Sequence, residues 1–116
     1  MSKNNSSRNS SHRVSPTILR KLVIETIKTV YDPEIPVNVY DLGLIYGVDV
    51  DEDLKVIITM TLTTPNCPAA GSLPGQVEGC VADLTDVTEA TVELTFDPPF
   101  TPDMMSDEAK LELGFL

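Results

Sequence analysis

The stretch Leu54-Lys55-Val56-Ile57-Ile58-Thr59-Met60-Thr61-Leu62 decides the fold of this chain. Apolar side chains occupy every second position from Leu54 to Leu62, which is the spacing of a β-strand with one buried face. A shorter alternation, from Tyr46 to Val50, precedes it across the acidic residues 51–53. Two such runs joined by so short a turn predict an antiparallel hairpin.

A helical pattern precedes this hairpin. Ser15-Pro16 offers an N-cap followed by a proline that suits the first helical turn. Asp32-Pro33 ends the pattern, because a residue before proline is pushed out of the α region. The sequence therefore predicts a helix over 16–31. Its apolar face, at three- and four-residue spacing, is made of Ile18, Leu19, Leu22, Val23, Ile27, Val30 and Tyr31.

After the hairpin, helix and strand signals alternate. Apolar residues within 73–84 have helical spacing, and this helix begins either near Ser72 or at Pro68 with a kink. A third period-two run covers 90–96, and Ser106 is placed to cap a last short helix.

This order of helix, strand, strand, helix, strand predicts an α/β (α+β) two-layer sandwich. Two apolar helix faces must cover one face of a mixed three-stranded sheet. We expect one domain, 16–116, because 116 residues are enough for a single core only. Residues 1–15 hold six Ser and three Asn, so we expect a flexible tail there.

The charge balance excludes some classes of partner. The net charge is −10, made of +3 in residues 1–15 and −13 in residues 16–116. Such acidity argues against binding nucleic acid or anionic lipid, which need clustered Lys and Arg. No run approaches the ~20 apolar residues that span a bilayer. The N-terminus lacks the apolar region of a secretory signal, so we expect a cytoplasmic protein.

Two cysteines carry most of the chemical information. Cys80 lies on the apolar face of the second helix, which predicts a small buried hydrophobic residue. Cys67 lies between a strand end and a helix start, where free backbone N–H groups favour a thiolate. By position alone, Cys67 is as well explained by a loop cysteine without a role. A disulfide between the two is not expected, because a continuous helix would separate them by ~20 Å.

Asp32-Pro33-Glu34 is a second candidate, because proline holds two carboxylates on a stiff loop. Helix termination with two solvated acids is the alternative. A cation bound between these acids and Cys67 would stabilise the carboxylates and the thiolate together.

The supply of metal ligands limits such a site. Iron–sulfur clusters usually take four thiolates and structural zinc takes four ligands. Outside the two cysteines, the chain offers one histidine, His12, in the expected tail. A closed metal site in one chain is therefore not expected. A site with Cys67 as a metal ligand would be shared with a second copy or a partner, or occupied transiently.

Three separate motifs stand out along the chain. They are Asp32-Pro33-Glu34-Ile35-Pro36-Val37 with Tyr40-Asp41-Leu42-Gly43-Leu44-Ile45-Tyr46, then Met60-Thr61-Leu62-Thr63-Thr64-Pro65-Asn66-Cys67-Pro68, and then Phe96-Asp97-Pro98-Pro99-Phe100-Thr101-Pro102-Asp103-Met104-Met105-Ser106 with Ala109-Lys110-Leu111-Glu112-Leu113-Gly114. Together they resemble the SufT family of iron–sulfur cluster assembly and maturation factors. PaaD proteins and the eukaryotic cytosolic iron–sulfur targeting protein belong to the same wider group.

The resemblance implies an accessory factor of the SUF system that is not an enzyme. It would help to mature or deliver iron–sulfur clusters by binding scaffold or carrier proteins and apo clients, as a monomer or a homodimer. No cofactor would be bound tightly, although a cluster or iron would visit transiently. The implied functional patch is Asp32, Glu34, Thr63, Thr64 and Cys67.

Two alternatives stay open at this point. The first is a thiol-dependent enzyme with Cys67 as nucleophile and Glu34 as base, since the lone histidine lies in the expected tail. The second is an acidic adaptor that binds a basic partner without any cluster chemistry.

Overall fold

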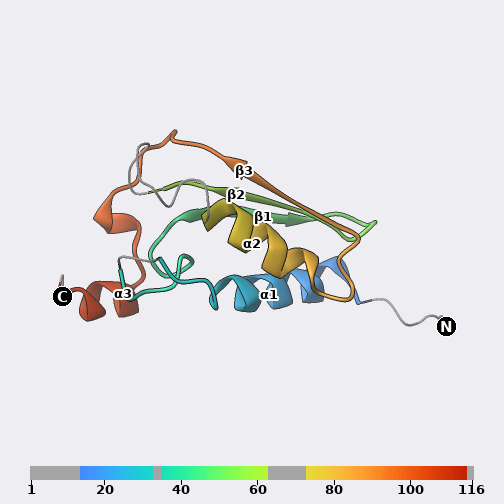
Figure 1. The fold of residues 1–116 in the computed structure, drawn as a ribbon, viewed down its shortest axis with the longest axis horizontal. Coiled ribbons are helices and arrows are strands. Elements are labelled where there is room, and N and C mark those ends of the chain that lie inside the picture. Colours follow the sequence, from blue (N-terminus) through green and yellow to red (C-terminus); the bar gives the residue numbers. More distant parts are fainter. Residues whose placement is uncertain (1–13, 33–34, 63–72, 115–116) are drawn as a thin grey trace.

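The computed structural model describes residues 14–32, 35–62 and 73–114 (Figure 1). Within those ranges, no helix is long and apolar enough to cross a membrane. The predicted order of helix, strand, strand, helix, strand is confirmed. The elements are α1 (Pro16–Ile27), β1 (Ile45–Val50), β2 (Lys55–Met60), α2 (Leu73–Ala82), β3 (Glu89–Leu94), the 3₁₀ turn η3 (Pro102–Met104) and α3 (Asp107–Glu112).

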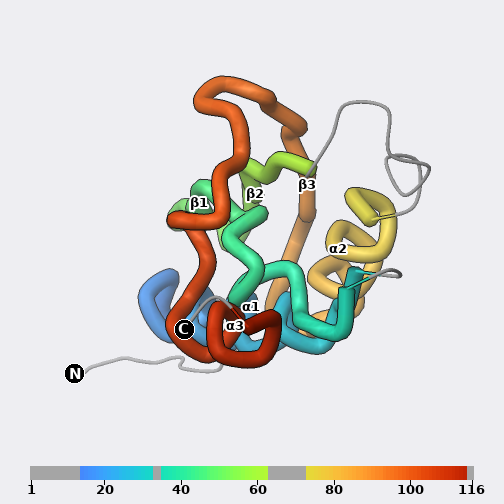
Figure 2. Tube along the Cα trace, turned by 90° about the vertical axis from the view of Figure 1, so that its left-hand side faces the viewer, coloured from blue at the N-terminus to red at the C-terminus, as the bar shows by residue number. Residues whose placement is uncertain are grey.

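The predicted mixed sheet is also confirmed. Its strand order is β1-β2-β3, with β1 antiparallel to β2 and β2 parallel to β3. Helix α1 packs against β1, α2 packs against β3, and the two helices contact each other. Figure 2 shows both helices on the same side of the sheet, as two-layer packing requires.

The core lies between this sheet face and the two helices. Strand β2 is central and directs alternate side chains into the core, while the helices contribute residues three to four positions apart. The most buried of these side chains are Leu19, Val23, Ile27, Val56, Ile58, Met60, Leu73, Val77 and Val81.

The hairpin turn is built by Asp51. Its Oδ1 accepts hydrogen bonds from the backbone N–H groups of Asp53 and Lys55, both at 2.9 Å. Leu54 has φ +62° in this turn, a conformation that is uncommon for any residue except glycine. Its side chain is nonetheless buried, so Leu54 belongs to the core while strand β2 begins one residue later.

Helix α1 ends at Ile27, which is earlier than the predicted end at Tyr31. The backbone N–H of Val30 donates to the Ile27 carbonyl, and that of Val39 donates to the Val30 carbonyl at 2.9 Å. Tyr31 then forms an isolated bridge with Asn38. The chain after the helix is therefore paired with the following loop, and Val30 is buried without being helical.

Some apolar residues expected in the core are exposed. Ile18 and Leu22 lie beside the buried face of α1, and Leu94 and Phe96 are exposed at and beyond the end of β3. Because β3 is an edge strand, neighbouring strands cover it on one side only. The third strand ends at Leu94, two residues before the predicted end at Phe96.

Both predicted helix caps on described residues are confirmed. The backbone N–H of Ile18 donates to Ser15 Oγ at 3.2 Å, and that of Ala109 donates to Ser106 Oγ at 3.1 Å. The start of α2 before Leu73, whether near Ser72 or at Pro68, and most of the expected tail 1–15 fall outside the described ranges.

Candidate functional site

The described parts of the three motifs meet at one end of the sheet. In Figure 1 the segment 35–44, the end of β2 and the region from 95 to α3 all lie toward the end marked C. Of the predicted patch, Asp32 is described. Glu34, Thr63, Thr64 and Cys67 lie outside the described residues.

Asp32 is buried at 8% exposure and closes the turn that follows it. Its Oδ1 accepts from the Ile35 backbone N–H at 3.2 Å, and its own N–H donates to the Val37 carbonyl at 3.4 Å. Asp32 is therefore tied to the backbone of Ile35 and Val37.

Cys80 is a free cysteine on α2 and is half-buried against the core. A small buried hydrophobic residue was predicted here, and the side chain does pack against the core, but it is only partly buried. It packs like an apolar residue at the border of the core, so α2 explains its presence without a chemical role.

Thr61 was not predicted as a candidate, yet it carries an unusual group. The residue is fully buried, and its Oγ1 has no hydrogen-bond partner in the part of the chain that is described. Its backbone N–H donates to the Leu44 carbonyl at 2.8 Å. Strand β2 ends at Met60, so strict alternation stops there and both Thr61 and Leu62 are buried. Period-two spacing placed Thr61 on the solvent side.

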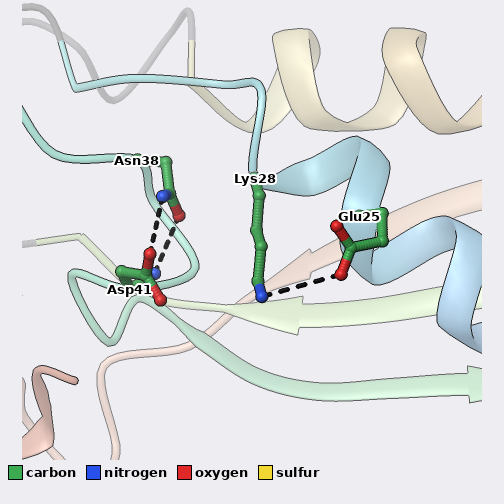
Figure 3. A network of polar contacts seen from close by, with 4 residues as sticks. All are labelled: Glu25, Lys28, Asn38 and Asp41. Carbon is green, nitrogen blue, oxygen red and sulfur yellow. Dashed lines mark hydrogen bonds and ion pairs between the residues drawn. The ribbon is translucent and has the colours of Figure 1, made fainter. Parts of the chain in front are cut away.

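The loop before β1 is held by Asn38 and Asp41 (Figure 3). Asn38 Nδ2 donates to Asp41 Oδ2 at 2.8 Å, and the Asp41 backbone N–H donates to Asn38 Oδ1 at 2.9 Å. Lys28 Nζ lies 3.7 Å from Glu25 Oε2 and 5.3 Å from the centroid of the Tyr40 ring. These contacts order the loop independently of any ligand.

The C-terminal segment is attached directly to this loop. Gly43 has φ +92°, and a Cβ at this position would lie 2.6 Å from the Met104 carbonyl oxygen. The Ser106 backbone N–H donates to the Asp41 carbonyl at 2.8 Å. Glycine is therefore required at 43 both by its backbone angle and by the close approach of the second segment.

A β-bulge aims Tyr46 at the same segment. Ile45 pairs with Met60 and Gly47 with Thr59, which leaves Tyr46 as the extra residue of β1. A bulge of this kind redirects a side chain. The Tyr46 hydroxyl donates to the Pro98 carbonyl at 2.8 Å and lies 3.4 Å from Met104 Sδ.

An open pocket of about 630 Å³ lies where these two segments meet, and most of its lining is apolar. Its lining residues are Tyr40, Asp41, Gly43, Ile45, Tyr46, Pro98, Met104 and Ser106. The first and third motifs thus build one cavity. Within the described ranges, no group of three or more His, Cys, Asp or Glu side chains is arranged to hold a metal ion.

The sequence motifs contain these residues, but their spacing does not predict that they lie side by side. The signal was present, since Gly43 and Tyr46 stand in one motif and Pro98 and Met104 in another. The contact joins positions more than 50 apart, as the separation of 52 between Tyr46 and Pro98 shows. No local pattern encodes such a pair.

Comparison with known proteins gives concordant matches. A family model described as "Iron-sulfur cluster assembly protein" matches residues 20–94. A Porphyromonas gingivalis protein named "Fe-S protein maturation auxiliary factor" is 56% identical over 94 residues, which cover 81% of this chain and 90% of that protein. The Staphylococcus aureus "Fe-S protein maturation auxiliary factor SufT" is 38% identical over 85 residues, 73% of this chain and 97% of that one.

A solved structure agrees with the fold. The crystal structure of a domain of unknown function from Bacillus anthracis superposes with a TM-score of 0.81 at 32% sequence identity. It covers 87% of this chain and 96% of that one.

Proposed function

This chain belongs to the iron–sulfur cluster assembly protein family, and on that premise we propose that it is an auxiliary factor in the maturation of iron–sulfur proteins. The resemblance to the SufT family that three motifs indicated is confirmed by the family match and by the named relatives. The observation that carries the proposal is the nearly full-length match, which covers 90% and 97% of two relatives named for this role.

Cys67 is the proposed centre of this function. Cluster iron is held by cysteine thiolates. The chain has two cysteines, and Cys80 on α2 packs against the hydrophobic core, so Cys67 is the better candidate. Because a cluster usually takes four thiolates, the remaining ligands come from a scaffold, a client or a second copy. The cargo therefore stays transiently, and each transfer exchanges one thiolate for another at iron without oxidation or reduction.

The polar patch around Cys67 is proposed to contain Asp32, Glu34, Thr63 and Thr64. Support comes from the chain path. Asp32 is hydrogen-bonded to Ile35 and Val37. The segment 35–44 and the end of β2, after which Cys67 follows in the sequence, lie at the same end of the sheet (Figure 1). Two carboxylates beside a thiolate would attract the iron cation and repel anions.

The proposal also covers how the protein acts, in which compartment, and with which partners. The protein acts by binding and handing over cargo without catalysing a reaction of its own, and it works in the cytoplasm with scaffold, carrier and apo client proteins. The relatives named as auxiliary factors support this role.

The proposal is tested in cells that lack the gene and carry wild type, Cys67→Ser or Cys80→Ser. Aconitase-type cluster enzymes are assayed under high demand for clusters, and protein levels are checked by immunoblot. We expect Cys67→Ser to behave like the empty vector and Cys80→Ser to restore activity. Full activity with Cys67→Ser at normal protein level would remove Cys67 from the mechanism.

A further inference from the structure

We infer that the pocket between residues 38–46, which are the loop before β1 and the first two residues of β1, and the C-terminal segment 95–114 is a docking site. It would bind a partner segment that presents an apolar side chain next to a lysine or arginine. The inference rests on the proposed function for the identity of the partner, which would be a client or a scaffold of cluster assembly. The binding chemistry itself follows from the residues that line the surface.

The apolar half of the site is the cavity of about 630 Å³. Ile45, Tyr46 and Met104 are among the residues that line it. Its volume lies in the range of pockets that bind small ligands, so an apolar side chain of a partner fits inside it.

The acidic half is a second pocket of about 210 Å³ that adjoins the first through Asp41. Asp41 lines both pockets, and the second is also lined by Glu108 and Glu112 of α3. No basic side chain lines either pocket among the described residues. The residues that line this second pocket therefore favour a cation presented by the partner.

The surrounding charge has the same sign. Residues 95–114 contain five acidic side chains and one lysine. Glu108 and Glu112 are four positions apart on α3, where two like charges lie on the same face and repel each other. A basic partner relieves this repulsion and is attracted from a distance, whereas an acidic partner is repelled.

The walls of the site are fixed before any partner arrives. The hydrogen bond from Tyr46 to the Pro98 carbonyl and the bond from the Ser106 N–H to the Asp41 carbonyl join the two segments. The side chain of Asn38 holds Asp41 in place (Figure 3). Such preorganisation lowers the entropic cost of docking.

The test begins with a random peptide library displayed on phage and panned against the full chain. We expect enriched peptides to contain an apolar residue within two positions of Lys or Arg. Binding of a synthetic enriched peptide should shift the backbone amide resonances of Gly43, Tyr46 and Ser106. Binding should also weaken as salt increases.

A charge variant and a matched control complete the test. Glu108→Gln with Glu112→Gln removes two exposed carboxylates from the acidic half, and we expect about three- to tenfold weaker binding. Glu89→Gln with Glu93→Gln removes two exposed carboxylates from β3 and should leave binding within about twofold.

Five results would overturn the inference. The first four are no enrichment, enriched peptides without basic residues, equal binding by the α3 variant, and resonance shifts confined to other surfaces. The fifth is a dimer in sedimentation whose Gly43, Tyr46 and Ser106 amide resonances shift on dilution, because a second copy then covers this face. Panning uses neither cluster nor client, so its failure leaves the Cys67→Ser result standing, and a failed cluster role leaves the peptide result standing.

Discussion

The Tyr46 hydroxyl donates a 2.8 Å hydrogen bond to the carbonyl of Pro98, which stands 52 positions later in the chain. The β-bulge in β1 directs Tyr46 toward this carbonyl. One hydrogen bond thereby links the strand that opens the hairpin to the segment that follows the sheet. Together with the hydrogen bond from the Ser106 N–H to the Asp41 carbonyl, it joins the two segments that line the cavity.

Replacing Tyr46 with Phe should lower the free energy of unfolding by about 0.5–1.5 kcal/mol, the usual net value of one hydrogen bond. For a domain of this size, that corresponds to a fall in Tm of about 4–8 °C per kcal/mol. Thermal and denaturant unfolding measure the change. Tyr31→Phe is the matched control, because Tyr31 is exposed and no hydrogen bond of its hydroxyl is found among the described residues. Equal stability of both variants would contradict the prediction.

Gly43→Ala should destabilise the protein by about 2–4 kcal/mol. The variant combines a positive φ, which costs an L residue ~1–2 kcal/mol, with a Cβ forced against the Met104 carbonyl. Gly79→Ala on α2 is the control, since nothing lies within 4 Å of a Cβ there. Alanine favours a helix over glycine by ~0.5–1 kcal/mol, so the control should gain stability. Denaturant midpoints that move in the same direction would refute this reading of Gly43.

Thr61→Val should stabilise the protein by about 1 kcal/mol. The substitution keeps the side-chain shape and removes a buried hydroxyl whose Oγ1 has no partner in the described part of the chain. Thr59→Val is the control for the higher strand propensity of valine. Thr59 is half-buried on the face of β2 that points away from the core, so this variant should stay within ~0.5 kcal/mol of wild type. A loss of stability in Thr61→Val would mean that the hydroxyl is hydrogen-bonded in solution.

Cys67→Ser should abolish iron–sulfur chromophore formation, because Cys67 is the proposed thiolate for the cargo. The measurement is anaerobic reconstitution with ferrous iron and sulfide, followed by visible absorption spectra before and after a chelator. Wild type and Cys80→Ser should develop the same chelator-sensitive bands. A chromophore in Cys67→Ser, or none in wild type, would count against a cluster visiting this residue.

The sequence alone predicted the order of the helices and strands and the pairing of the hairpin. Period-two spacing from Leu54 onward predicted β2 and its pairing with β1, and Ser15 and Ser106 marked two helix starts that the hydrogen bonds confirm. These are local properties. Strand alternation and N-cap geometry depend on residues a few positions apart, so they can be read along the chain.

The end of α1 shows where local reading stops. Periodicity identified Val30 as buried, which is correct, but extended the helix to Tyr31, which is wrong. Pairing of Val30 with Val39 competes with the helix, and that competition depends on the loop folding back. In the same way, alternation could not show that Leu94 and Phe96 are exposed, because exposure depends on what covers an edge strand.

The candidate site also has one part that follows from the sequence and one part that only the tertiary structure decides. The residues Asp32, Glu34, Thr63, Thr64 and Cys67 follow from the family resemblance, and their joint arrangement stays a prediction. The pocket shared by the loop of Gly43 and the segment of Met104 was decided by tertiary structure alone. A bulge, a positive φ and a close backbone contact bring distant segments together, and short-range spacing carries no record of such contacts.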